Sequence, residues 1–143
     1  MVLRLDDVAT EAVRSHNGRV VKLLGDGVLI WFPDTGSAVD ATLDVLAALP
    51  AAGLPTGHAG IAAGSVIIRE NDVFGRTVNL AARIADVAPD GHVYLSAAAA
   101  DALDAGVGWA IEPVDPAVLQ GIGRVELVDV SRRAPGAIDL PRE

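Results

Sequence analysis

Apolar and polar positions follow two different periods along this chain, and the changes of period mark its elements. Residues 20–24 and 28–32 are apolar apart from Lys22, and they flank the tripeptide Gly25-Asp26-Gly27. Because Asp and Gly both tolerate positive φ, this pattern predicts a β-hairpin with Asp26 at its tip. A carboxylate at such a tip is a suitable oxygen ligand for a hard cation such as Mg²⁺.

A helical period follows Gly75, with Thr77 as the candidate N-cap. The apolar face of this helix would consist of Val78, Ala81, Ala82 and Ala85. Asn79 and Arg83 are four residues apart, so they would share another face, one turn from each other. An amide beside a guanidinium suits an anionic, oxygen-rich ligand such as a phosphate ester. Asp72 is expected in a loop just before this helix.

The rest of the pattern predicts an alternation of helices and strands. Helices are expected at about residues 3–17, 37–49, 77–87 and 97–105, in addition to the two hairpin strands. Further strands are expected at about residues 56–63, 64–69, 92–96, 107–111 and 124–130. The second helix should start at Thr35-Gly36-Ser37 and end at Pro50. This alternation is typical of an α/β or α+β protein.

Composition narrows the class of protein. The 143 residues suffice for one domain with a real core, expected at residues 1–131, before a proline-containing tail at 132–143 that we expect to be disordered. The net charge of −8 weighs against a nucleic-acid partner, and the absence of Cys excludes disulfides and thiolate zinc sites. We find no apolar run of membrane-spanning length and no signal-peptide pattern, so we expect a cytoplasmic protein without a membrane segment.

Three stretches together resemble the catalytic domain of class III nucleotidyl cyclases, the adenylate and guanylate cyclases. They are GRVVKLLGDG at 18–27, GIAAG at 60–64 and DVFGRTVNLAAR at 72–83. The resemblance covers about residues 3–130 and implies an α+β fold, a ferredoxin-like sandwich of β-α-β-β-α-β type. In that family two divalent metals, Mg²⁺ or Mn²⁺, promote attack of the ribose 3′-hydroxyl on the α-phosphate, which releases pyrophosphate.

The resemblance also implies a role for each matched residue. Asp26 resembles one of the two metal-binding aspartates. Lys22 and Asp72 resemble the pair that selects adenine, in which lysine donates to ring N1 and the carboxylate accepts from the 6-amino group, so the substrate would be ATP. Asn79 resembles the residue that orients the ribose, and Arg83 the one that stabilises the transferring phosphoryl group. The working form would be a homodimer, or a heterodimer with another cyclase domain, in which each site takes Asp26 from one chain and the other residues from its partner.

Two departures from the family pattern bear on activity. The family's other metal aspartate lies on a first strand with a pattern like F-x-D-I-x-G-F-T, which has no match here, so we expect that strand to be missing. Asp6 and Asp7 lie in an amphipathic stretch and fit solvated helix residues better than substitute ligands. Gln120 stands where the family often has a lysine that reaches the terminal phosphates, and Arg124 is nearby. We therefore expect weak or no activity from this chain alone.

Each candidate also has an ordinary structural interpretation. Alone, Asp26 would be a turn residue, Lys22 part of a solvated strand face, Asp72 a loop carboxylate, and Arg83 a surface partner of Asp86. Their joint match to a known site favours function. Two functions stay open: an adenylate cyclase domain, and a non-catalytic cyclase-like module that dimerises or binds nucleotide. An F-x-D pattern encoded in frame immediately upstream would favour the first.

Overall fold

The computed structural model describes residues 5–24, 27–70, 72–103 and 108–132. In chain order the elements are α1 (Leu5–Arg14), β1 (Arg19–Leu24), β2 (Gly27–Trp31), α2 (Thr35–Ala51), β3 (Ala59–Ile61), β4 (Ile67–Arg69), β5 (Asp72–Phe74), α3 (Arg76–Val87), β6 (Val93–Ser96), α4 (Ala97–Ala100), β7 (Trp109–Leu119) and β8 (Gly123–Arg132). The α+β class is confirmed. The candidate metal ligand Asp26 and the expected tail from residue 133 onward lie outside the described residues.

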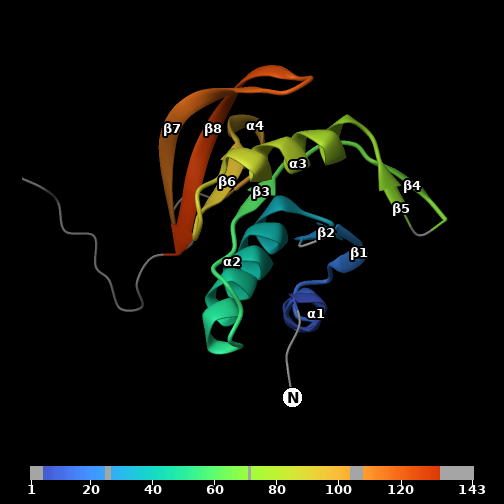
Figure 1. Cartoon of the computed structure of the whole chain (residues 1–143). Coiled ribbons are helices and arrows are strands. Elements are labelled where there is room, and N and C mark those ends of the chain that lie inside the picture. Colours follow the sequence, from blue (N-terminus) through green and yellow to red (C-terminus); the bar gives the residue numbers. More distant parts are fainter. Residues whose placement is uncertain (1–4, 25–26, 71, 104–107, 133–143) are drawn as a thin grey trace, which may run out of the picture.

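A four-stranded sheet with the order β3-β6-β8-β7 forms the centre of the fold. β3 and β6 are parallel, and the crossover between them contains the β4–β5 hairpin and α3. β8 is antiparallel to both β6 and β7. The hairpins β1–β2 and β4–β5 are separate two-stranded sheets, and β4–β5 projects beyond the N-terminal end of α3 (Figure 1).

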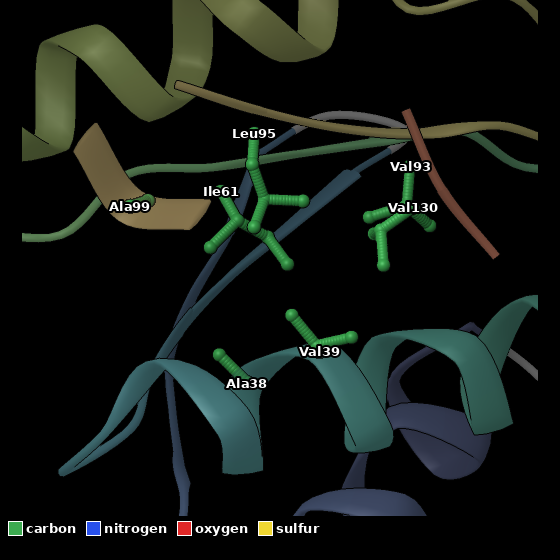
Figure 2. Packing of buried hydrophobic residues seen from close by; sticks show 7 residues of the cluster. All are labelled: Ala38, Val39, Ile61, Val93, Leu95, Ala99 and Val130. Carbon is green, nitrogen blue, oxygen red and sulfur yellow. The ribbon is translucent and has the colours of Figure 1, made fainter. Parts of the chain in front are cut away.

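The central sheet is covered on both faces, as the period-2 alternation along β6 requires. Val93 and Leu95 face α2, and Figure 2 shows them with Ile61 and Val130 opposite Ala38 and Val39. Tyr94, between them in sequence, packs with the second cluster, which is formed by Ile84 of α3 with Leu119 and Leu127. Ile84, Val93 and Leu95 are almost completely buried. The sheet is thus held between α2 and α3.

Gly60 explains how closely α3 lies on the sheet. A Cβ at this position of β3 would lie 2.3 Å from the backbone nitrogen of Ala85 and 2.5 Å from the carbonyl oxygen of Ala81. These are backbone atoms of α3, so a larger residue cannot be accommodated by rotating a side chain. Glycine therefore sets the distance between α3 and β3.

Helix α2 begins within its expected start and ends later than predicted. It begins at Thr35 after the N-cap Asp34, whose Oδ1 accepts from the backbone N–H of Ser37 at 2.7 Å. It continues through Pro50 to Ala51, whereas Pro50 was expected to end it. The backbone N–H of Ala52 still donates to the carbonyl of Ala48 at 3.1 Å. The helix can therefore close its last turn although proline contributes no N–H there.

The C-terminal hairpin is longer than the sequence suggested. β7 was expected to stop at Ile111 but runs to Leu119, through Pro113 and Pro116. Prolines are tolerated because β7 is an edge strand, paired only with β8, and its register shifts between Val114 and Ala117. β8 extends through Arg132, one residue past the expected domain boundary. In contrast, β3 and α4 are shorter than predicted.

Candidate functional site

Lys22 and Asp72 meet although 50 residues separate them in the sequence. The ammonium of Lys22 on β1 donates to Asp72 Oδ2 on β5 at 3.1 Å. The other carboxylate oxygen, Oδ1, accepts from the backbone N–H of Val73 at 2.8 Å. The hydrogen bond from Val73 has the largest effect and lowers the pKa of Asp72 below its usual value; burial opposes this shift, and the hydrogen bond and charge of Lys22 add to it. Asp72 is therefore ionised at neutral pH, and the contact is an ion pair.

The position of Asp72 corrects one expectation. It does not lie in a loop but begins β5, where it pairs with Arg69 of β4. Val73 is buried, whereas Asp72 and Phe74 on either side of it are partly exposed. Since side chains alternate along a strand, Asp72 and Phe74 share one face. A three-residue strand holds only one full alternation, which is too short a pattern to predict from sequence.

Lys22 follows an irregularity of the first hairpin. Val20 pairs with Ile30 and Lys22 with Leu29, which leaves Val21 as an extra residue on β1. An extra residue of this kind bends a strand and redirects the side chain that follows it. The Lys22 ammonium also lies 5.8 Å from the ring centroid of Phe74. The sequence interpretation missed Phe74, although an aromatic residue two positions after Asp72 was an available signal.

Gly75 joins β5 to the helix that carries the other two candidates. Its φ of +124° is a conformation that side-chain-bearing residues rarely adopt, and it allows α3 to begin at Arg76 directly after the strand. Gly75 is also the N-cap, so the expectation that Thr77 caps the helix is wrong. The hydroxyl of Thr77 instead donates to the carbonyl of Ser65 at 2.9 Å. That bond ties the start of α3 to the segment before β4.

Asn79 and Arg83 lie on α3 one turn apart, both exposed. Arg83 makes the local contact that its surface interpretation anticipated, 3.3 Å to Asp86 Oδ2, with both side chains largely exposed. An exposed pair of this kind is easily exchanged for another anion. Among the hydrogen bonds and ion pairs of the described residues, none joins Asn79 or Arg83 to the Lys22–Asp72 pair.

The described residues alone do not supply a metal centre. Within residues 5–24, 27–70, 72–103 and 108–132, no three His, Asp or Glu side chains are grouped so as to hold an ion. Asp7 is exposed on α1, as expected of a solvated helix residue. The β1–β2 strands pair as far as Leu24 with Gly27, which confirms the predicted pairing of the two strands; position 26 itself lies outside the described residues. Gln120 and Arg124 are exposed at the β7–β8 turn.

Residues 52–131 match the family model described as the adenylate and guanylate cyclase catalytic domain. The chain belongs to this class III cyclase family. It is 36% identical over 104 residues to an adenylate cyclase of Streptomyces coelicolor, a match that covers 72% of this chain and 27% of that protein. It is also 36% identical over 103 residues to a putative adenylate cyclase 3 of Rhizobium meliloti, covering 67% of this chain and 18% of that protein. The cyclase domain thus spans about a quarter or less of the length of these relatives.

Solved cyclase structures have the same fold. An adenylate/guanylate cyclase/hydrolase from Silicibacter pomeroyi superposes with a TM-score of 0.74 at 21% identity, covering 90% of this chain and 81% of that one. An adenylyl cyclase from P. aeruginosa gives a TM-score of 0.72 at 14% identity, covering 93% and 83%. The expected ferredoxin-like cyclase fold is confirmed. No helix in the described part of this cyclase domain is both long and apolar enough to cross a bilayer.

Proposed function

We propose that this chain is an adenylate cyclase domain that converts ATP to cyclic AMP and pyrophosphate. The observation that carries the proposal is the 3.1 Å ion pair between Lys22 and Asp72. It joins a cation and a carboxylate from two stretches that resemble the family, and together they have the donor and the acceptor that adenine requires.

Base selection follows from the hydrogen-bonding capacities of the two groups. The ammonium can only donate and the ionised carboxylate can only accept. Adenine offers an acceptor at N1 and a donor at its 6-amino group, so both contacts are satisfied. Guanine offers an N–H at position 1 and a carbonyl at position 6. The ammonium would then face a donor, and the carboxylate would face an acceptor. Unpaired polar groups of this kind discriminate strongly between otherwise similar ligands.

The remaining roles belong to residues outside this pair. Asn79 orients the ribose, and Arg83 leaves Asp86 to stabilise negative charge on the transferring phosphoryl group. Asp26 is the proposed ligand for Mg²⁺ or Mn²⁺. Divalent ions in such a site stabilise the attacking and leaving oxygens of an in-line displacement. The functional unit is a dimer with a second copy or with another cyclase domain, and Asp26 of one chain serves the Lys22, Asp72, Asn79 and Arg83 set of its partner.

The first test addresses base selection. We expect the protein to bind ATP more tightly than GTP in calorimetry with Mn²⁺, and the double variant Lys22→Glu/Asp72→Cys to lose this preference. Arg19→Glu is the control for the charge reversal at Lys22, because it makes that same change at an exposed position of the same strand. Equal affinity of the unmodified protein for the two nucleotides would refute the assignment.

The second test addresses the dimer. An Asp26→Ala chain is mixed with an Arg83→Ala chain, each extended by the F-x-D first strand of a relative. If sites form between chains, each heterodimer retains one intact site and cyclic AMP production returns. Absence of recovery after native mass spectrometry has shown mixed dimers would contradict the shared site.

Turnover by the 143-residue chain alone should be low. Only one of the two metal aspartates, Asp26, has a match in these residues, and Gln120 removes a phosphate contact. Each ~1.4 kcal/mol of lost transition-state stabilisation costs tenfold in rate. A cyclic AMP assay with saturating Mn²⁺ and ATP measures this. A chain that selects ATP, yet stays inactive even with the first strand supplied, would instead be the non-catalytic nucleotide-binding module.

A further inference from the structure

The aromatic ring of Phe74 lies beside the Lys22–Asp72 pair and has no part in the proposed function. It is 46% exposed, although it is one of the largest apolar side chains of the protein. Its ring centroid lies 5.8 Å from the Lys22 ammonium, within the range of a cation–π interaction. It also shares the outward face of β5 with Asp72. One strand therefore presents two groups to the same cation.

The hydrogen-bonding groups of Lys22 and Asp72 are only partly used by the contacts between them. An ammonium carries three N–H groups and no acceptor. One is given to Asp72 at 3.1 Å, and the face of Phe74 attracts the cation from a second side. Within the part of the chain that the structure describes, no other acceptor contacts this ammonium, so it can donate to a ligand as well. On Asp72, Oδ1 is engaged by Val73 and Oδ2 by Lys22, and each oxygen keeps a second lone pair.

We propose that Phe74 is a positioning residue for base selection: its ring holds the Lys22 ammonium beside Asp72, so that one donor and one acceptor face the ring edge of an adenine together. The inference rests on the proposed function, because it concerns the same pair of base-reading side chains. Phe74 does not need to touch the reacting atoms.

The need for such a residue follows from the properties of lysine. Its ammonium lies at the end of a flexible four-carbon stem, and the side chain of Lys22 is 41% exposed. An exposed ion pair alone restrains such a side chain weakly. A second contact from a strand residue fixes the ammonium before the ligand arrives, which reduces the ordering that binding must otherwise supply.

The position of Lys22 can be measured without nucleotide. In the unmodified protein the ring should shift the NMR signals of the Lys22 Cε protons upfield, because Cε carries the ammonium that lies over the ring. Phe74→Leu should return these signals to ordinary lysine values, and Phe74→Tyr should keep them shifted. Ile67→Leu is the matched control, since Ile67 is the partner of Phe74 across the β4–β5 hairpin and is also exposed. Ordinary Lys22 signals in the unmodified protein would overturn the inference.

Selectivity is measured next, with 3′-deoxy-ATP and 3′-deoxy-GTP, which cannot be cyclised because they lack the attacking hydroxyl. A contact of cation–π strength predicts that Phe74→Leu reduces the preference for the adenine nucleotide about twofold to fivefold. Phe74→Tyr and Ile67→Leu should preserve it.

The outcomes separate the two proposals. No adenine preference in the unmodified protein would refute the proposed function, and this inference with it. An adenine preference that survives unchanged in Phe74→Leu would leave the proposed function intact and overturn the role of Phe74.

Discussion

Gly60→Ala tests whether the close packing of α3 on β3 controls the fold. The new Cβ would lie 2.3 Å from the backbone nitrogen of Ala85, whereas ordinary contacts begin at 3.4 Å. Relieving the overlap therefore requires a separation of about 1.1 Å. Both nearest atoms belong to the α3 backbone, so the helix itself has to move. Overpacking of this kind typically costs ~1–3 kcal/mol, and a backbone obstacle favours the upper end of that range.

The expected loss of stability can be measured by thermal unfolding. For a domain of this size each 1 kcal/mol shifts the melting temperature by roughly 4 °C, so Gly60→Ala should melt about 8–12 °C lower. Gly36→Ala is the matched control. Its Cβ would meet its nearest neighbours at 3.4 Å, and it lies within α2. Alanine is a better helix former than glycine by up to ~1 kcal/mol, so this variant should melt at the same temperature or higher.

The same displacement has a consequence for activity. Asn79 and Arg83 move with α3, and a misplacement of about 1 Å can cost on the order of 10²-fold in rate. In a chain with measurable cyclase activity, Gly60→Ala should therefore lower turnover even below its melting temperature. If Gly60→Ala had the same melting temperature as the unmodified protein, the packing argument would be refuted, because the helix would then have moved without loss of stability.

Three further predictions concern stability. Ile84→Ala should lower the free energy of unfolding by about 2–5 kcal/mol in urea titrations, because Ile84 is fully buried, whereas Ile68→Ala at an exposed position should change it little. Asp34→Ala should lower the melting temperature by removing the N-cap of α2, and Asp34→Asn should preserve it, since an amide oxygen can still accept from Ser37. The pKa of Asp72 is lower in the folded protein than its value of ~3.9 in an unfolded chain. The ionised Asp72 carboxylate therefore contributes fully to stability above the unfolded pKa, and this contribution is lost as the pH falls through the folded pKa. In urea titrations, the difference in free energy of unfolding between Asp72→Asn and the unmodified protein should therefore disappear in acid.

The sequence predicted those features that depend on local chemistry. The Asp-Gly pattern predicted the β1–β2 hairpin, and the helical period after Gly75 placed Asn79 and Arg83 one turn apart on α3. Neither local pattern indicates that Lys22 should meet Asp72. That expectation came from the match to a family, and the two side chains do lie in contact.

The features that were missed depend on tertiary context. Pro50 was expected to end α2, but the helix includes it and ends at Ala51. The strand expected at about residues 107–111 runs to Leu119, and its place at the sheet edge makes Pro113 and Pro116 acceptable within it. Phe74 was read as part of a motif and not as a neighbour of Lys22, since the bulge at Val21 that redirects this lysine has no sequence signature.

The Lys22–Asp72 contact has a second consequence, because it joins two hairpins that lie outside the central sheet. Among the described strands, β1–β2 and β4–β5 share no backbone ladder with the four-stranded sheet or with each other. Gly75 makes β5 continuous with α3, which is anchored on β3 at Gly60 and on the sheet by Ile84. Under the proposed function, an adenine that contacts both Lys22 and Asp72 would act at a joint between α3, which is anchored on the sheet, and the first hairpin, which packs on α1. Adenine binding would then adjust the first hairpin, which carries position 26, relative to the helix of Asn79 and Arg83. In the proposed dimer, Asp26 of this hairpin serves the partner's site, so base selection in one site would affect the placement of the metal ligand in the other.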